Sequence, residues 1–245
     1  MFDKRKGIAA LLTVLVLLSA TTETFAQQWQ VQLPVQHRSQ QENWSCGPNT
    51  IAMWAGYIKK ASFVTNTIAD KYTGRDGTDL KEFEDAMFAL TPYGYVFSDW
   101  AYTNKYTAIK GIMYSLARFN EPVAISGNNG KHYYLVVGGV ASRNPYTNYG
   151  TQSNIQYLYL YDSRENSPIY TNPSLLQGEW KSWLSVNYWP VFKKGQRYTP
   201  DQVMLNWTQI GAIGDKKWRS IERNSYAAWG SQRATYYNRA SFFSY

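Results

Sequence analysis

The chain has 245 residues, of which 44% are hydrophobic and 17% are charged, and its formal net charge is +8. This length suits one ordinary domain or two small ones, and the apolar content excludes a disordered chain. Because Cys46 is the only cysteine and His37 and His132 are the only histidines, an internal disulfide and a thiolate-rich structural zinc site are excluded, and we expect no metal or other cofactor.

The first 26 residues have the composition of a secretory signal peptide. Basic residues at 4–6 precede an apolar run over 8–20, and Thr24-Phe25-Ala26 is a small-residue type of cleavage site. The apolar run has about thirteen residues, whereas a membrane-spanning helix needs about 20. We therefore expect a secreted or periplasmic protein whose mature chain begins near Gln27 and has no integral membrane span; an uncleaved anchor is the alternative.

The first half of the mature chain carries mostly helical patterns. Residues 29–35 alternate apolar and polar side chains, as a short strand does. From Cys46, apolar residues recur at helical spacing for about fourteen residues. Further helices are expected over 66–72, from a cap at Thr78 or Asp79 to just before Pro92, and from about 105 to 120.

At Pro122 the period changes from helical to strand-like. Residues 122–126 and 132–140 are expected to form a hairpin across an Asn-Gly turn, and 155–162 a further strand. Strand-like pieces follow at 180–188 and 203–207. Helices followed by antiparallel strands indicate an α+β domain in which the sheet packs on the helical half.

The boundary of this domain is expected near residue 170. We assign 27–170 to the α+β domain, and we interpret the aromatic-rich segment 171–245 as its completion or as a C-terminal extension. No linker rich in proline, glycine or serine separates the two parts.

Cys46 is the residue on which the functional interpretation depends. A lone thiol in an exported chain is buried, paired between molecules, or kept for its chemistry. Cys46 stands at the predicted start of a helix and precedes Gly47-Pro48. Unpaired backbone N–H groups and the helix dipole favour the thiolate there, so we expect a lowered cysteine pKa and a sulfur nucleophile.

A sulfur nucleophile also needs a proton carrier, and histidine is the usual one. His132 opens a strand after a tight turn, so it is preferred to His37, which lies in a polar loop. Asp162 ends the next strand, where its carboxylate could fix the imidazole tautomer. Taken singly, His132 at a hairpin tip and Asp162 at a turn are also compatible with a purely structural role. Together, Cys46, His132 and Asp162 follow the chain order of papain-like folds.

Several short motifs extend this pattern, and they are Leu33-Pro34-Val35, Gln40, the stretch from Trp44 to Pro48, the stretch from Lys131 to Gly139, and the stretch from Leu158 to Asp162. On these motifs, residues 31–163 resemble the papain-like cysteine peptidases, and they are most similar to the bacterial double-glycine (bacteriocin-leader-processing type) peptidases. The resemblance implies a papain-like fold, with the nucleophile at a helix N-terminus and the helical half packed on an antiparallel sheet.

The resemblance also implies the role of each site residue. Cys46 would be the nucleophile, His132 the general base and acid, and Asp162 the residue that orients the histidine. Gln40, six residues before Cys46, would form the oxyanion hole with the backbone N–H of Cys46, and Gln41 is the fallback. The chain departs from the family pattern at Pro48-Asn49, where a small residue is usual, and at Ser163, where proline is common.

These observations predict a thiol peptidase that hydrolyses a peptide bond in a peptide or protein substrate. One alternative is an amidase or acyltransferase of the same fold that acts on cell-wall peptides. Another is a non-catalytic module that binds glycans or proteins through aromatic residues such as Trp180 and Trp183. The basic charge favours an anionic cell-wall polymer as a further partner, whereas its diffuse distribution argues against nucleic acid.

Overall fold

The computed structural model describes residues 28–92, 95–102, 105–127, 132–147, 155–168, 191–206 and 226–233. The predicted signal peptide, the predicted turn between the hairpin strands, the strand-like segment 180–188 and the tryptophans of the binding-module alternative lie outside these residues. Within the described ranges, no helix is both long enough and apolar enough to cross a membrane.

The predicted helices form within a residue or two of their expected bounds. They are α2 (Cys46–Lys59), α3 (Thr65–Ile68) with the π-helical turn η1 (Ala69–Thr73), α4 (Leu80–Leu90) and α5 (Lys105–Phe119). Asp79 caps α4 in a capping box, in which its side chain accepts the backbone N–H of Glu82 and the Glu82 side chain accepts that of Asp79. The start of α2 at Cys46 is confirmed.

The strands form one antiparallel sheet, and they are β1 (Trp29–Gln32), β2 (Tyr95–Tyr102), β3 (Val123–Gly127), β4 (His132–Ala141), β5 (Ile155–Asp162) and β6 (Tyr226–Arg233). Strand β4 is its centre. Along one edge β4 pairs with β5, and along the other it pairs first with β3 and then with β1. Strand β6 joins β3 to β2. The predicted α+β class, a helical half with an antiparallel sheet, is confirmed.

Two strands and one helix differ from the sequence prediction. The pairing of β2 with β6, which crosses more than a hundred residues of chain, was not predicted. The strand expected over 203–207 is wrong, because the described part of it belongs to the helix α8 (Pro200–Asn206). Pro200 suits a first helical position, and Thr199 and Gln202 exchange backbone and side-chain hydrogen bonds across the first turn.

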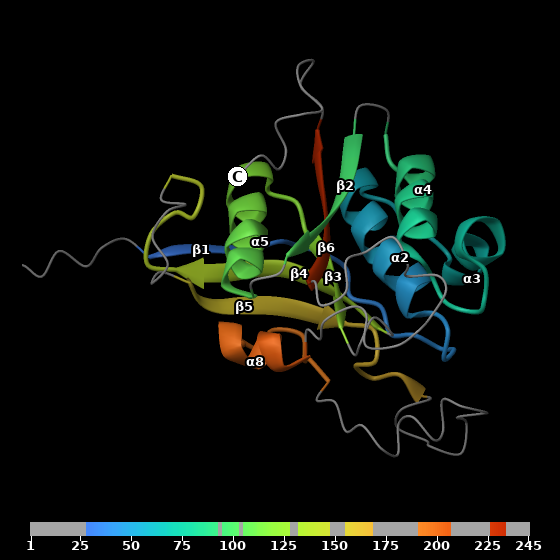
Figure 1. Ribbon diagram of the computed structural model, residues 1–245. Coiled ribbons are helices and arrows are strands. Elements are labelled where there is room, and N and C mark those ends of the chain that lie inside the picture. Colours follow the sequence, from blue (N-terminus) through green and yellow to red (C-terminus); the bar gives the residue numbers. More distant parts are fainter. Residues whose placement is uncertain are drawn as a thin grey trace, which may run out of the picture.

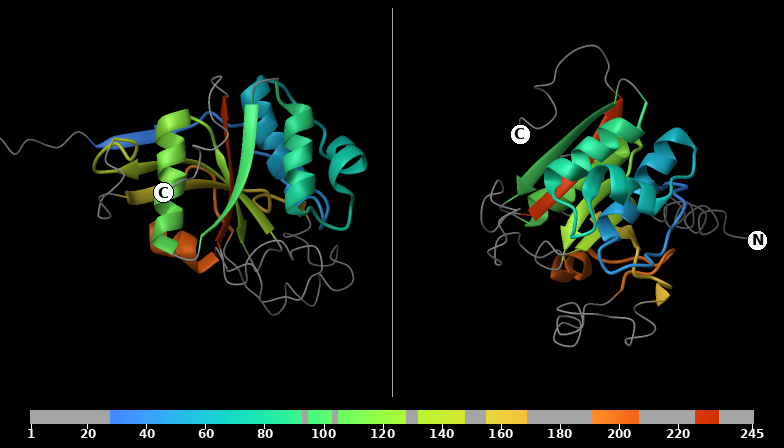
Figure 2. Two further views of the ribbon diagram at one scale, coloured as in Figure 1. Left: turned by 45° about the horizontal axis from the view of Figure 1, so that its top comes forward. Right: turned by 90° about the vertical axis from the view of Figure 1, so that its right-hand side faces the viewer.

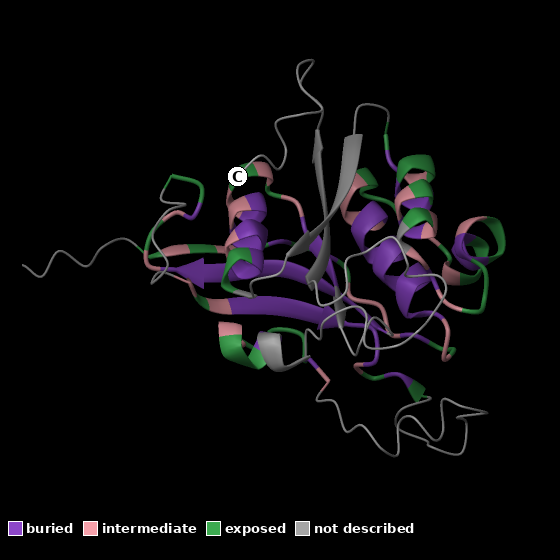
Figure 3. Cartoon of the chain, viewed as in Figure 1, coloured by how far each residue is buried: buried purple, intermediate pink, exposed green. Residues whose placement is uncertain are grey.

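The helices lie against the sheet so that the first turn of α2 meets the start of β4. Helix α2 packs on β4, α4 packs on β2, and α5 packs on β6 and β4 (Figures 1 and 2). Figure 3 shows α2, β4 and most of β5 as buried, and α2 is buried continuously from Cys46 to Ala55.

An aromatic row joins these elements. The ring of Trp54 in α2 lies 6.0 Å from that of Phe83 in α4, which stacks at 5.1 Å on Tyr133 in β4. The hydroxyl of Tyr133 donates to the backbone oxygen of Thr78, just before α4, at 2.6 Å. Because Tyr133 follows His132 directly, this packing sets where the first residues of β4 lie relative to α2.

Candidate active site

Cys46 is the first residue of α2 and is 8% exposed. Neutral polar groups surround its backbone. The Asn49 side chain donates to the Ser45 carbonyl at 2.8 Å, and the Thr50 hydroxyl donates to the Cys46 carbonyl at 2.9 Å. Gly47 is required by close packing, since a Cβ at this position would lie 2.2 Å from Oγ1 of Thr78.

The environment of the sulfur makes it a thiol at neutral pH. Burial raises the pKa of Cys46 to about 11, although hydrogen bonds from the backbones of Tyr133 and Gly47 favour the thiolate. The expectation of a lowered pKa is therefore wrong, because removing the sulfur from water outweighs the donors at the helix start. The hydrogen bond from the Tyr133 backbone also places the sulfur of Cys46 against the start of β4, at the residue that follows His132.

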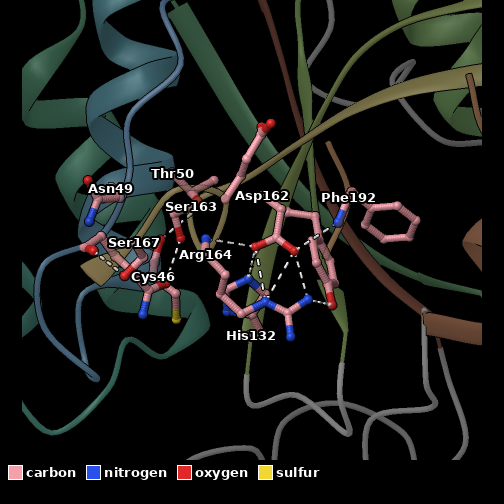
Figure 4. Close-up of polar contacts among 12 residues, drawn as sticks. Cys46, Asn49, Thr50, His132, Asp162, Ser163, Arg164, Ser167 and Phe192 are labelled. Atoms are coloured by element: carbon pink, nitrogen blue, oxygen red, sulfur yellow. Dashed lines mark hydrogen bonds and ion pairs between the residues drawn. The ribbon is translucent and has the colours of Figure 1, made fainter. Parts of the chain in front are cut away.

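His132 and Asp162 lie together at the ends of neighbouring strands. Residue 134 of β4 is paired with Asp162, the last residue of β5, so the sheet places His132 just beyond that end. Nε2 of His132 lies 2.8 Å from Oδ1 of Asp162, and both side chains are buried (Figure 4). Because a carboxylate only accepts hydrogen bonds, Nε2 carries the proton and Nδ1 of the neutral ring carries a lone pair.

Arg164 completes this cluster, and the sequence interpretation missed it. Its guanidinium donates to Oδ2 of Asp162 through Nη2 at 2.7 Å and approaches both carboxylate oxygens through Nε at 3.1 Å. Its backbone N–H donates to Oδ1 at 2.9 Å. The signal available in the sequence was an arginine two residues after the aspartate that ends a strand.

The ionisation of the cluster follows from these contacts. Burial alone would raise the pKa of Asp162, but the charges of Arg164 and His132 outweigh it and hold that pKa well below its usual range. Burial lowers the pKa of His132; Asp162 opposes this effect and Arg164 adds to it. At neutral pH the cluster is therefore a neutral imidazole beside a buried carboxylate–guanidinium pair.

Gln40 is buried and held by the turn that follows β5. Its Oε1 accepts the Ser163 hydroxyl at 2.7 Å, and its Nε2 donates to the backbone oxygen of Glu42 at 3.1 Å. Its backbone N–H donates to the Ser163 carbonyl at 2.7 Å, and its carbonyl accepts the Ser167 hydroxyl. These bonds fix the orientation of the amide, whereas the fallback residue Gln41 is exposed.

His37 lies behind Asp162 and does not contact its carboxylate. Nε2 of His37 lies 2.9 Å from the backbone oxygen of Asp162 and 3.6 Å from Oε2 of Glu165. Its ring meets Tyr161 edge-on at 5.3 Å. His37 thus bonds to the backbone of Asp162, whereas His132 bonds to its carboxylate. In the part of the chain that the structure describes, no three His, Cys, Asp or Glu side chains gather as metal ligands would.

Among known proteins, similarity to this chain was found only in solved structures. No family model matches the chain, and no curated protein matches it. A double-glycine motif protease from an AMS/PCAT transporter, solved in complex with the leader peptide, is 13% identical, with a TM-score of 0.44 over 83% of this chain and 94% of that chain. The peptidase domain of Streptococcus ComA, a bifunctional ABC transporter of a quorum-sensing pathway, is 14% identical, with a TM-score of 0.41 over 80% and 97%. UfSP from C. elegans is 11% identical, with a TM-score of 0.47 over 89% of this chain and 37% of that chain.

Proposed function

We propose that the chain is a thiol peptidase that hydrolyses a peptide bond through a thioester on Cys46. The observation that carries the proposal is the 2.8 Å contact between Nε2 of His132 and Oδ1 of Asp162, beside a thiol at the start of a helix. A buried neutral imidazole with an oriented lone pair is a competent base for a neighbouring thiol.

In the first half-reaction the sulfur of Cys46 attacks the carbonyl carbon of the scissile bond. Nδ1 of His132 takes the thiol proton as the bond forms, because the resting sulfur is protonated. The tetrahedral intermediate collapses when the C–N bond breaks, and His132 returns the proton to the leaving amine. Asp162 stays ionised throughout and stabilises the imidazolium.

In the second half-reaction water hydrolyses the thioester. His132 takes a proton from the attacking water and returns it to the sulfur of Cys46, which restores the thiol and releases the carboxylic acid. In both half-reactions negative charge develops on the substrate oxygen. We assign its stabilisation to the backbone N–H of Cys46 and the side chain of Gln40, whose amide is fixed by Ser163 and Glu42.

The experiment that tests this function uses the single thiol of the chain. A peptide carrying a carbon electrophile at its C-terminus should add once to the protein, and intact-mass and peptide mapping should place the adduct on Cys46. Hydrolysis of a peptide library should be abolished in the Cys46→Ala variant. His132→Ala should lose both labelling and hydrolysis, because the thiol then lacks its base. Hydrolysis that survives in Cys46→Ala would contradict the proposal.

We also propose that the peptidase acts outside the cytoplasm, in the periplasm or after secretion, on a peptide or protein. The charged and apolar segments before Gln27 support this location. The net charge of +8 supports a cell-wall polymer as an additional anionic partner. N-terminal sequencing of the protein purified from the source cells should begin near Gln27. Retention on peptidoglycan should fall as the salt concentration rises, and salt-independent retention would contradict a charge-based contact.

A further inference from the structure

Arg164 is a buried cation for which the reaction above has no use. Its side chain is 2% exposed, and it lies in the turn after β5, outside the nucleophile, base and oxyanion groups. A buried guanidinium is costly unless it is paired, so its placement beside the base needs a reason. The contacts of the Asp162 carboxylate supply that reason.

Every side of the Asp162 carboxylate is occupied. Oδ1 accepts from His132 at 2.8 Å and from the backbone N–H of Arg164 at 2.9 Å. Oδ2 accepts from the Arg164 guanidinium at 2.7 Å and lies 3.3 Å from the backbone N–H of Phe192 (Figure 4). The carboxylate therefore cannot turn away from Oδ1 pointing at His132 without breaking several hydrogen bonds.

The guanidinium is itself held in place. Nη2 of Arg164 donates to the hydroxyl of Tyr134 at 3.1 Å, and the cation lies 5.6 Å from the centre of that ring. The Tyr134 ring in turn meets His132 edge-on at 4.7 Å and Phe192 at 5.1 Å. Tyr134 is thus in contact with the base and with the cation.

We propose that Arg164 is a positioning residue that fixes the Asp162 carboxylate against Nε2 of His132 and offsets part of its charge there. This inference rests on the proposed function and adds a residue to its machinery. A carboxylate alone would favour the charged imidazolium in the resting enzyme, which cannot accept the proton of Cys46. The paired guanidinium weakens that preference while it leaves the hydrogen bond that orients the ring.

The charged and titratable groups around His132 come from each neighbouring element. Asp162 ends β5, Arg164 lies in the next turn, Tyr134 lies on β4 and Cys46 starts α2. Among them, Asp162 and Arg164 are the charged pair at neutral pH. Removing the cation should therefore leave an uncompensated carboxylate beside His132 and raise the pH at which the ring takes up a proton.

The test measures the protonation of His132 by NMR, with and without Arg164. The sequence has only two histidines, so the His37→Asn variant assigns both ring signals. In Arg164→Met the titration midpoint of His132 should rise by about one pH unit or more, as expected for a carboxylate within about 4–6 Å. The acid limb of the pH profile of kcat/KM should move to higher pH by the same amount. A midpoint equal to that of the wild type would overturn the proposal.

Two further variants separate the effect of the Arg164 charge on His132 from a merely structural role of Arg164. Arg197→Met also removes a cation that contacts a tyrosine hydroxyl, that of Tyr159 at 3.0 Å, and it should leave the midpoint unchanged. If Arg164→Met does not fold, Asp162→Asn/Arg164→Met removes both charges of the pair together. Its His132 midpoint should lie above that of Asp162→Asn alone, in which the Arg164 cation stays in place; equal midpoints in these two variants would overturn the proposal.

The NMR titration also keeps this inference separate from the peptidase assignment. If no peptide is hydrolysed, the proposed function fails, while the midpoint still decides whether Arg164 offsets the charge of Asp162. If the wild type is active and neither the midpoint nor the acid limb moves in Arg164→Met, the inference about Arg164 fails and the proposed function stands.

Discussion

On the helix side of the site, Cys46 is held by neutral groups, whereas on the strand side His132 is held by a buried ion pair. The side chains of Asn49 and Thr50 donate to the backbone carbonyls of Ser45 and Cys46 through amide and hydroxyl groups. Asp162 and Arg164 bring opposite charges against the imidazole. Both sides are buried, so the difference lies in what burial costs. A neutral thiol needs only packing, but a buried charge needs a partner of opposite sign.

Removing one charge from the strand side should have the largest effect on stability. Asp162→Asn should lower the free energy of unfolding by about 3–5 kcal/mol, because Arg164 would stay buried without its carboxylate. Urea denaturation followed by fluorescence measures this loss. Asp85→Asn is the matched control, since it breaks an exposed ion pair with Lys81 and should change stability little. Equal losses of unfolding free energy in the two variants would show that the buried ion pair stabilises the protein no more than the exposed one.

The second prediction concerns the charge state of the helix side. Because the pKa of Cys46 is raised to about 11, the thiolate becomes abundant only as the pH rises toward that value. At pH 8, alkylation of the folded protein by iodoacetamide should be about 100-fold slower than that of a free thiol with the usual pKa of 9.0, a difference of two pKa units. Alkylation at pH 6 that is faster than that of free cysteine would instead indicate a thiolate in the resting site.

The third prediction tests packing on the helix side without touching a charge. Gly47→Ala should lower the free energy of unfolding by about 1–3 kcal/mol, because the new Cβ would lie 2.2 Å from Oγ1 of Thr78. The second change Thr78→Gly should restore part of the loss by removing the side chain that clashes. Thermal unfolding of Gly47→Ala and of the double variant, each compared with the wild type, measures the loss and its recovery. A gain in stability in Gly47→Ala, as helix propensity alone predicts, would argue against the close contact.

The smallest effect is expected from His37, at the margin of the strand side. His37→Ala removes one hydrogen bond to the backbone oxygen of Asp162 and should cost about 1 kcal/mol of stability. Hydrolysis should persist with a modestly lower kcat, because the carboxylate keeps its bonds to His132 and Arg164. The control is Gln41→Ala, since Gln41 is exposed and lies in the same segment before α2. Loss of hydrolysis in His37→Ala with full activity in His132→Ala would reverse the assignment of the base.

Local patterns in the sequence were enough to place most elements. The helical spacing after Cys46 predicts α2, and the alternation before Asp162 predicts β5, since both depend on neighbours a few residues away. The strands β2 and β6 escaped prediction because each is defined by its partner across the chain. The helix α8 was mistaken for a strand because a short apolar run fits both periods, and its cap at Thr199 was overlooked.

For the site, local patterns predict the residue types and their positions in the secondary structure. These are a thiol at a helix start, an imidazole at a strand start and a carboxylate at a strand end. That β4 and β5 bring His132 to Asp162, that Arg164 pairs with this carboxylate, and that burial keeps Cys46 a thiol follows from the tertiary fold alone. The physical reason is that periodicity is local, whereas desolvation and charge pairing depend on which distant segments enclose a group.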